Sequence, residues 1–442
     1  MLLKCKVKGC SITFANIFCG YKCWLRFYIL LTALGYFSHK ILNILQHNKT
    51  LYMKMHPSTA AIRTQIETTN EMEHATPLYL TSSFIFDNAE GMRSAFADEN
   101  DDNIYSRFSN PNVQEFTQKI VLLEGAEAGY ATATGMSAVF ASFMAILKQG
   151  DHLLSCNAIF GSTHTVIKKY LPNYGIETSY VPAESNAAEW EAAIRPNTKM
   201  IYIETPTNPG LTIIDIAMVS KIAKKYNIIL NIDNCFATPL NQNPIALGAD
   251  LVVHSATKWL DGQGRVLGGI VVGKEALIND IYLFCRSTGP ALSAFNAWVL
   301  SKSLETLDVR MERHAKNALH IATALESNVA IAWLKYPYLK SHPQYPIAIT
   351  QMKNGGGIVC FELKGGLAAG ITFLNHLKLL SLTANLGDTR SIASHPASTT
   401  HAKLTEAERL AVNITPGLIR ISVGLEHVAD ILQDIEQALA CI

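Results

Sequence analysis

Short apolar runs in this chain alternate with longer segments in which apolar residues recur at helical spacing. Strand-like runs occupy residues 153–155, 200–203, 228–230, 251–253 and 269–272, and helix-forming segments occupy 138–147 and 216–226. Strands that alternate with helices of this length predict βαβ units and a mostly parallel sheet. From about residue 301 a long helical segment, 301–326, precedes shorter strand runs. This change predicts a second, smaller α+β domain.

Two of these runs end on ionisable and hydroxyl residues. The run 228–230 leads to Asp233, and the run 251–253 leads to Ser255, Thr257 and Lys258. The ends of neighbouring parallel strands share one crevice, so Asp233 and Lys258 are predicted to face one pocket. Such a pair suits pyridoxal phosphate (PLP), because the lysine can bond to its aldehyde and the acid can keep its ring nitrogen protonated. The hydroxyls of Ser255 and Thr257 are then available to its phosphate. Taken singly, a loop lysine and a turn aspartate are more commonly structural.

Composition narrows the class of protein. The chain has 442 residues, of which 49% are hydrophobic and 17% charged, as in a globular protein of two or three domains. With 37 basic against 36 acidic residues, the net charge of +1 gives no reason to expect nucleic acid or an anionic membrane as a partner. Nine cysteines are too few for a disulfide scaffold and favour a reducing cytoplasm.

Residues 1–52 differ from the rest of the chain. They are basic and aromatic, they contain Cys5, Cys10, Cys19 and Cys23 without zinc-site spacing, and their apolar run at 27–37 is too short to span a bilayer. We interpret them as an atypical extension from an over-extended reading frame, with Met53 or Met55 as the expected start. A membrane-associating extension is the alternative, because the segment is basic and partly apolar.

The sequence around the two strand ends is specific. Asp-Asn-x-Phe-Ala-Thr-Pro begins at 233 and Ser-Ala-Thr-Lys-Trp begins at 255, which puts acid and lysine 25 residues apart. Together they resemble the PLP-dependent transsulfuration enzymes, the cystathionine γ-synthase and methionine γ-lyase family, from about residue 57 to 442. The resemblance implies an α/β fold of the aminotransferase type (fold type I), with a mostly parallel seven-stranded sheet sandwiched by helices. It also implies PLP as cofactor, Lys258 and Asp233 as catalytic residues, an arm at 53–111, a large PLP-binding domain at 112–300 and a C-terminal substrate domain at 301–442.

Two further pairs have side chains or backbone groups suited to a phosphate. Gly135 and Met136 open a helix, whose first N–H groups are free to bind an anion, although an ordinary helix start would look the same. Tyr105 and Arg107 project to the same side if their segment is extended, although an exposed polar loop is the commoner interpretation. The resemblance implies that both pairs contact the phosphate, the second from a neighbouring subunit. An obligate dimer follows, and in this family two dimers usually form a homotetramer.

Phe160 and Ser162 depart from much of the family. Where Phe160 stands, the resemblance implies a tyrosine stacked on the cofactor ring, and phenylalanine can stack but cannot carry a proton. Ser162 replaces a reactive cysteine of the methionine γ-lyases, so both departures count against the lyase. Asn208 lies next to Pro209 in a loop that prolines restrain, and its family counterpart hydrogen-bonds the cofactor 3′-oxygen. A plain turn asparagine is the alternative.

Arg420 lies on an alternating strand-like segment, 419–423, and arginine binds carboxylates through two parallel hydrogen bonds. The ordinary interpretation is a surface arginine on a strand. The family has its substrate-carboxylate arginine in this motif, and the resemblance implies that Asn385 assists it. His395 and His401 lack further ligands at metal-site spacing, so we expect them to be structural and expect no metal.

Within the family, segments 160–163 and 385–401 are most similar to sulfhydrylases that make homocysteine from O-succinylhomoserine, or O-acetylhomoserine, and sulfide. Cystathionine γ-synthase and methionine γ-lyase activities use the same scaffold and stay open as alternatives. A non-catalytic PLP-fold protein, tethered through its first 52 residues, is disfavoured because the cofactor residues other than the ring-stacking tyrosine are present.

Overall fold

The computed structural model describes residues 4–7, 10–13, 55–399, 402, 405–411 and 414–442. The chain divides into two units, residues 1–56 and 57–442. In the first, strand β1 (Lys4–Val7) pairs antiparallel with β2 (Cys10–Thr13). Several predictions fall outside the described residues: those on Cys19, Cys23, the run 27–37, Met53 and His401.

The larger sheet of residues 57–442 has seven strands in the order β3-β9-β8-β7-β6-β4-β5. These are β3 (Ala128–Thr132), β4 (His152–Cys156), β5 (Glu177–Val181), β6 (Thr198–Glu204), β7 (Ile229–Asp233), β8 (Leu251–Ser255) and β9 (Gly269–Gly273). Strands β5, β4, β6, β7 and β8 are parallel neighbours, and β9 runs antiparallel to both β8 and β3. The predicted mostly parallel sheet is therefore confirmed, and each strand-like run of the sequence overlaps a strand, although Ile228 lies just before β7.

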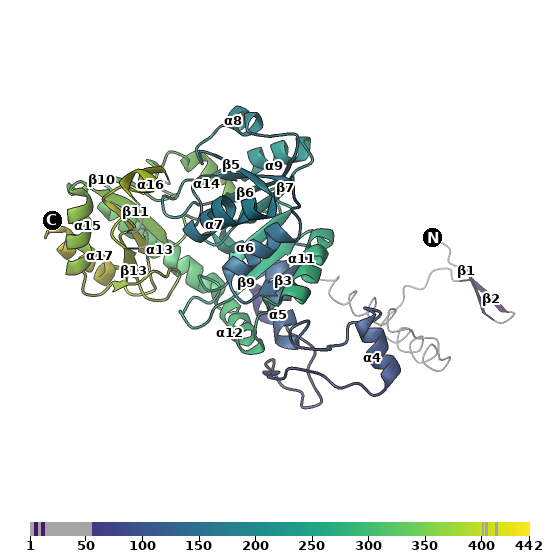
Figure 1. The fold of residues 1–442 in the computed structure, drawn as a ribbon. Helices are drawn as coiled ribbons and strands as arrows, with labels where there is room; N and C mark the ends of the chain where they lie inside the picture. Colours follow the sequence, from purple (N-terminus) through teal and green to yellow (C-terminus); the bar gives the residue numbers. More distant parts are fainter. Residues whose placement is uncertain (1–3, 8–9, 14–54, 400–401, 403–404, 412–413) are drawn as a thin grey trace. The chain divides into compact units, whose positions relative to one another are not determined.

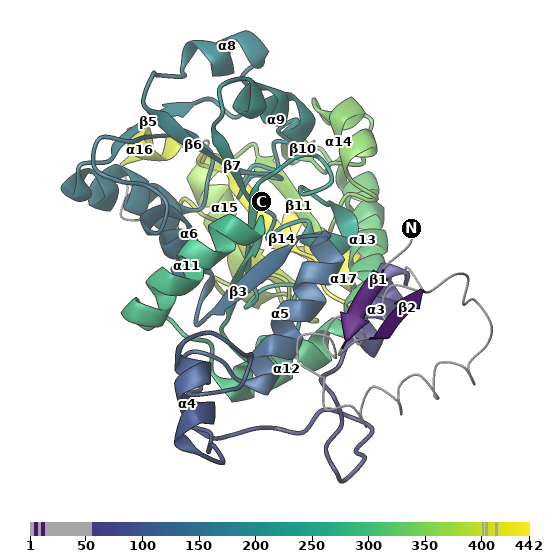
Figure 2. The same ribbon diagram turned by 90° about the vertical axis from the view of Figure 1, so that its right-hand side faces the viewer.

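Helices cover both faces of this sheet because its central strands are apolar on both sides. Helix α6 (Gly135–Met144) packs with α11 (Glu275–Thr288) against β3 and β9, and α5 (Pro111–Glu124) contacts the same strands. Figure 2 shows α6 and α11 on one side of β3 and α5 on the other. The remaining helices of this region are α7 (Gly161–Thr165), η1 (Val166–Tyr170), η2 (Leu171–Tyr174), α8 (Ala187–Ala192), α9 (Ile216–Lys225) and α10 (Thr238–Asn241).

A second sheet follows in the C-terminal part, with five strands in the order β10-β11-β14-β13-β12. They are β10 (Ile331–Lys335), β11 (Ile358–Leu363), β12 (Ser381–Leu382), β13 (Ile392–Ser394) and β14 (Leu418–Ser422). Helices α15 (Gly366–His376) and α17 (Val428–Leu439) pack together, and α15 contacts β11 and β14 (Figure 1). Two short helices, α14 (Tyr345–Gln351) and α16 (Glu406–Ala411), complete this part.

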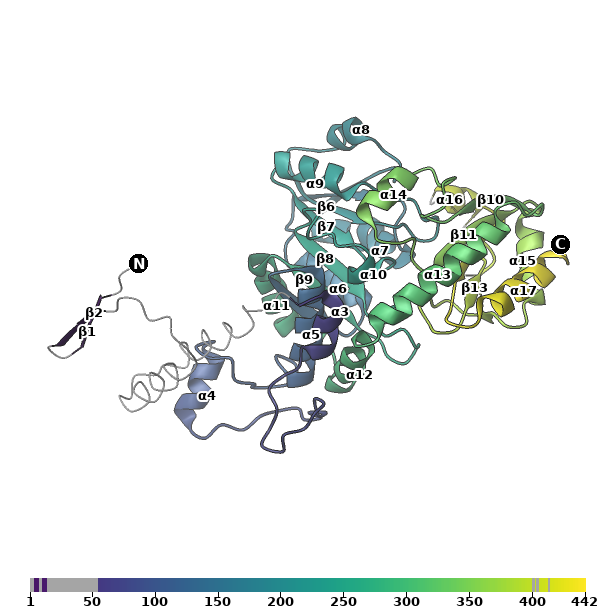
Figure 3. The same ribbon diagram turned by 180° about the vertical axis from the view of Figure 1, so that it is seen from behind.

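The predicted single helical segment at 301–326 is wrong in detail. The structure has α12 (Ala294–Leu304) and α13 (Leu307–Leu325), interrupted at residues 305–306. The carbonyl of Ser303 accepts hydrogen bonds from the Thr306 N–H at 3.2 Å and from Arg310 Nη2 at 2.9 Å, which closes the first helix. Helix α13 then contacts β10 and β11 of the smaller sheet as well as α10 and α12, as Figure 3 shows from behind.

The segment before α5 contains two helices, α3 (Pro57–Arg63) and α4 (Ala89–Phe96). The extended segment on which Tyr105 and Arg107 would project to the same side is not what the structure shows. Residues 105–109 form a turn, because the N–H groups of Phe108 and Ser109 both bond to the Tyr105 carbonyl, at 2.7 and 3.1 Å. The domain boundaries near 111 and 300 stay predictions. Within the described residues, no helix combines the length and the apolar character that crossing a membrane requires.

Candidate active site

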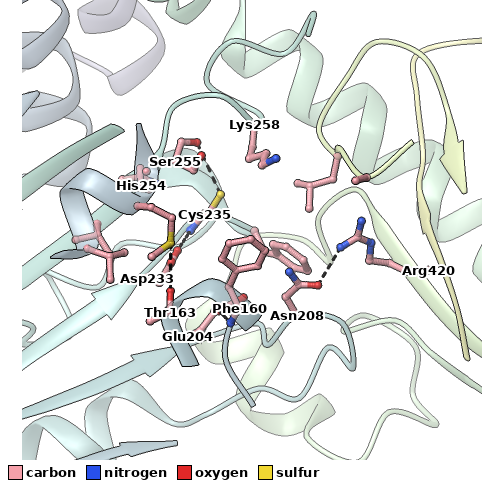
Figure 4. A pocket seen from close by; sticks show the side chains of 17 residues that line it. Phe160, Thr163, Glu204, Asn208, Asp233, Cys235, His254, Ser255, Lys258 and Arg420 are labelled. Carbon is pink, nitrogen blue, oxygen red and sulfur yellow. Dashed lines mark hydrogen bonds between the residues drawn. The ribbon is translucent and has the colours of Figure 1, made fainter. Parts of the chain in front are cut away.

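A cavity of about 120 Å³ lies where the carboxyl ends of the large sheet face β14 of the small one (Figure 4). Strands β6, β7 and β8 end at this cavity on Glu204, Asp233 and Ser255. The cavity is lined by Gly135, Met136, Val139, Phe160, Thr163, Glu204, Asn208, Asp233, Cys235, Phe236, Val253, His254, Ser255, Lys258, Ala384, Leu386 and Arg420. The prediction that Asp233 and Lys258 face one pocket agrees with this lining.

Lys258 follows β8 and is partly buried at the cavity wall. Its Nζ donates a hydrogen bond to Asn385 Oδ1 at 2.7 Å. Burial lowers the pKa of Lys258 from its ordinary value, and the charge of Arg420 acts in the same direction, although Cys235 opposes them. A lysine of this kind is a better base and nucleophile at neutral pH than an exposed one.

Asp233 ends β7 and is held by two donors. The Cys235 N–H donates to Oδ1 at 2.9 Å, and the Tyr202 hydroxyl donates to Oδ2 at 3.2 Å. Burial raises the pKa of Asp233, while the Cys235 hydrogen bond and the charge of His254 oppose the rise. A carboxylate fixed in this way can hold a proton on a neighbouring ring nitrogen.

Glu204 is a site residue that sequence reasoning missed. It pairs with Asp233 across the parallel strands β6 and β7, and its Oε2 accepts the Phe160 N–H at 2.7 Å. Burial raises the pKa of Glu204 well above its ordinary value, and the charge of Asp233 adds to the effect. The signal was available, because Glu204 ends an apolar strand just as Asp233 does.

The start of α6 approaches the end of β8 closely. A Cβ on Gly135 would lie 2.6 Å from Ser255 Cβ and 2.8 Å from Ser255 Cα, so only glycine allows this contact. Thr134 caps the helix by accepting the Ser137 N–H at 3.0 Å. The free N–H groups of the first turn and the Ser255 side chain therefore flank one corner of the cavity, beside Met136.

Three of the predicted cofactor residues are not on the cavity lining. The Thr257 hydroxyl lies 3.1 Å from the Gly268 N–H and 3.3 Å from the Gly268 carbonyl, and it bonds to both. Tyr105 is 40% exposed, and the Arg107 guanidinium donates to the Arg286 carbonyl while packing over Phe108 at 4.7 Å. Their predicted phosphate contacts stay predictions.

Arg420 is 7% exposed, so the interpretation as a surface arginine is wrong. It lies on β14, the central strand of the smaller sheet, and its side chain lines the cavity. Its Nη1 donates to Asn208 Oδ1 at 2.9 Å and its Nη2 to the Asn385 carbonyl at 3.3 Å, whereas Nε is buried without a partner among the described residues. Burial lowers the pKa of Arg420.

Phe160 lines the cavity and is 44% exposed (Figure 4). His395, expected to be structural, has partners for both ring nitrogens: the Ser398 hydroxyl and the Pro416 carbonyl, each at 2.7 Å. In the part of the chain that the structure describes, no three His, Cys, Asp or Glu side chains gather as metal ligands would.

The donor set fits PLP. The α6 N-terminus with Ser255 suits a phosphate, Asp233 suits a pyridinium, Lys258 suits an aldehyde, and the unpartnered Nε of Arg420 suits a carboxylate. A parallel sheet with these groups at its strand ends, next to a smaller α+β part, has the architecture of a fold type I PLP enzyme.

Comparison with known proteins agrees with this class. The chain belongs to the Cys/Met metabolism PLP-dependent enzyme family, which matches residues 58–440. It is 43% identical over 384 residues to the O-succinylhomoserine sulfhydrylase of Pseudomonas aeruginosa, covering 87% of this chain and 95% of that protein. It is also 44% identical over 366 residues to the L-methionine gamma-lyase of Pseudomonas deceptionensis, covering 82% and 92%.

Two solved structures have the same fold. The metB protein of Corynebacterium glutamicum is 36% identical and superimposes with a TM-score of 0.82, covering 87% of this chain and 98% of that one. A Campylobacter jejuni protein described as an O-acetylhomoserine (thiol)-lyase is 32% identical with a TM-score of 0.83, covering 87% and 100%, and contains a pyridoxyl-lysine group.

Proposed function

We propose that this chain catalyses a PLP-dependent γ-replacement that makes L-homocysteine from O-succinyl-L-homoserine, or O-acetyl-L-homoserine, and sulfide. The observation that carries the proposal is the identity of the aromatic residue at position 160 of the cavity lining. Phe160 has no ionisable group, so this position cannot protonate a leaving group. The similarity to O-succinylhomoserine sulfhydrylases supports the same choice.

Leaving-group chemistry links Phe160 to the substrate. Methionine loses methanethiolate, a basic anion that departs well only when an acid protonates it. An acylated homoserine loses a carboxylate, which is stable as an anion and needs no proton. A cavity without a phenol at this position therefore favours acylated homoserine over methionine.

In this proposal Arg420 binds the substrate. Its guanidinium lines the cavity, its Nε has no partner among the described residues, and its other nitrogens donate to Asn208 Oδ1 and the Asn385 carbonyl. The fork is therefore already oriented for the α-carboxylate of an amino acid.

Lys258 is the proton carrier. PLP, when bound, supplies an aldehyde that bonds to amines and a ring that accepts electrons. Once substrate has released Lys258, its neutral Nζ would take a proton from the substrate Cα, pass that proton to the cofactor and, neutral again, take one from Cβ, which would permit loss of the acyl carboxylate from Cγ. Asn385 Oδ1, 2.7 Å from Nζ, holds the amine between these steps. After sulfide adds at Cγ, Lys258 returns the protons.

One alternative is methionine γ-lyase activity, which the comparable sequence identity to lyases supports. The other is cystathionine γ-synthase activity, in which cysteine is the nucleophile. The test compares kcat/KM for O-succinylhomoserine with sulfide against kcat/KM for methionine, in the wild type and in Phe160→Tyr. We expect a strong preference for the acyl substrate in the wild type and an unchanged acyl rate in the variant. A wild type that prefers methionine would reject the proposal.

We also propose that Tyr105 and Arg107 complete the phosphate site of a neighbouring subunit, in a dimer of which two form a tetramer in the cytoplasm. Their absence from the cavity lining supports a role outside their own subunit. Exposed apolar side chains nearby support burial by a partner, among them Leu80 at 75% and Ile85 at 100% exposure. Sedimentation equilibrium gives the assembly, and a stable monomer that binds PLP would contradict it.

A further inference from the structure

Lys258 lies in a turn that follows β8, and a side chain from α13 completes the hydrogen bonds of that turn. The Lys258 carbonyl is bonded within the turn, by the Gly262 N–H at 2.8 Å. The next carbonyl, that of the fully buried Trp259, accepts instead from Arg310 Nη1 at 2.8 Å. A buried carbonyl needs a donor, so Arg310 supplies a bond that the turn does not make for itself.

Arg310 is 5% exposed and is held by oxygen atoms from two segments. Its Nη2 donates to the Ser303 carbonyl near the end of α12 at 2.9 Å and to the Leu260 carbonyl at 3.5 Å. Its Nε donates to Thr306 Oγ1 at 3.2 Å. Burial lowers the pKa of Arg310 to about 10, so the side chain is a cation at neutral pH, and these oxygens offset the cost of burying it. The guanidinium is therefore fixed before it meets the turn.

Gly262 makes room for this guanidinium. Its φ of +69° lies in the left-handed region, and a Cβ at this position would overlap Arg310 Nη1. Glycine adopts such a conformation without strain and also leaves the space free. The sequence of the turn therefore suits the approach of an arginine from α13 as well as the path of its own backbone.

The segment that carries Asn385 also packs against the backbone of Lys258. A Cβ on Gly387 would lie 3.0 Å from the Lys258 carbonyl carbon and 2.7 Å from the Trp259 nitrogen. Asn385, two residues earlier, accepts a hydrogen bond from Lys258 Nζ at 2.7 Å. A shift of the turn would therefore move Nζ relative to its partner and to the cavity. Arg310 is not on the cavity lining, so it can act on the site only through the turn.

We propose that Arg310 is a positioning residue for Lys258: by bonding the Trp259 carbonyl from α13, it fixes the turn so that Nζ meets the Cα proton of a bound amino acid. The inference rests on the proposed role of Lys258 as the proton carrier. Proton transfer requires hydrogen-bond distance, so a displaced amine reacts more slowly. Binding of the amino acid through Arg420 should change little, because Arg420 contacts other segments.

The test follows exchange of the Cα hydrogen of L-norvaline in D2O by NMR, with the PLP-loaded protein and with rates expressed per bound PLP. L-Norvaline has no leaving group at Cγ, so its exchange reports proton abstraction alone, whichever replacement or elimination the protein catalyses. In Arg310→Met we expect the rate at saturation to fall about 10- to 100-fold, and the half-saturating concentration to stay within about threefold. Backbone amides of residues 256–262 should exchange about tenfold faster, as measured by mass spectrometry.

Asn317→Ala is the matched control. Asn317 lies on the same helix and is also buried, and its side-chain amide donates to two carbonyls outside the turn, those of Gly424 and Glu426, at 3.0 Å each. This variant should unfold at a lower temperature, yet leave the L-norvaline rate and the amide exchange of the turn unchanged. Arg310→Lys keeps the buried cation with fewer donors, and it should show both effects of Arg310→Met in smaller degree. It decides the question if Arg310→Met does not fold.

An unchanged L-norvaline rate in the folded Arg310 variant would overturn the inference. An equal loss in Asn317→Ala would also overturn it, because the effect would then be a general loosening of α13. The same holds for a slower rate without faster amide exchange in the turn.

Lys258→Ala separates the inference from the proposed function. If Lys258→Ala exchanges L-norvaline at the wild-type rate, the role of Lys258 as proton carrier fails. If Lys258→Ala abolishes exchange and Arg310→Met does not slow it, only the inference fails.

Discussion

Substituting Gly135 by alanine tests the contact between α6 and β8 that forms the phosphate corner. The new Cβ would lie 2.6 Å from Ser255 Cβ, and ordinary contacts begin near 3.4 Å, so the two segments must separate by about 0.8 Å. Overpacking of this kind costs about 1 to 3 kcal/mol. Because the strain falls on the groups that flank the phosphate, we expect it to appear as a PLP dissociation constant raised about 5- to 150-fold.

The assay is fluorescence titration of the apoprotein with PLP, together with thermal unfolding of the apoprotein. Gly91→Ala is the matched control, because Gly91 lies in the first turn of α4 and its Cβ would meet only Asn88 Oδ1, at 3.6 Å. That control should bind PLP normally and unfold at the same or a higher temperature. If Gly135→Ala bound PLP within twofold of the wild type and unfolded at an unchanged temperature, the argument from close approach would be refuted.

Three further predictions follow from the described contacts. Arg420→Lys should lower kcat/KM for the acyl substrate about 100-fold, through loss of the two-point contact with the carboxylate, while the absorbance of bound PLP stays unchanged; a changed KM for PLP instead would contradict the assignment. Because burial lowers the pKa of Lys258, kcat should fall with decreasing pH through a midpoint below the ordinary lysine value of about 10.4, and a midpoint above it would be inconsistent. Burial would raise the pKa of Asp434, but hydrogen bonds from the N–H groups of residues 378–380 lower it. This carboxylate therefore stabilises the fold above about pH 4, and its contribution is lost on further acidification. Asp434→Asn should therefore cost about 2 kcal/mol near neutral pH and less near pH 3, as measured by urea unfolding at both values, and an equal loss at both would contradict it.

The sequence was sufficient for the central strands because their side chains are buried on both faces. Such strands read as unbroken apolar runs, and the polar residue that ends each run marks the cavity edge. Asp233 and Lys258 are recognisable in this way. Glu204 is recognisable by the same argument, but the prediction for that loop rested on Asn208, which lies four residues further along the chain.

Other features depended on tertiary contacts that a single sequence does not contain. Arg420 resembles a surface residue on an alternating strand, and its burial involves contacts with Asn208 and Asn385, which lie far from it in the sequence. Tyr202 lies inside an apolar run, where its hydroxyl gave no sign that Asp233 is its partner. At the break between α12 and α13, the Arg310 side chain donates a hydrogen bond to the Ser303 carbonyl.

The proposed activity is tested most directly by products formed from O-succinylhomoserine by the PLP-loaded protein, with and without sulfide. We predict homocysteine only when sulfide is present, and loss of that product in Lys258→Ala. Rapid release of 2-oxobutyrate and ammonia with little homocysteine, in the presence of sulfide, would contradict the account and assign the site to elimination.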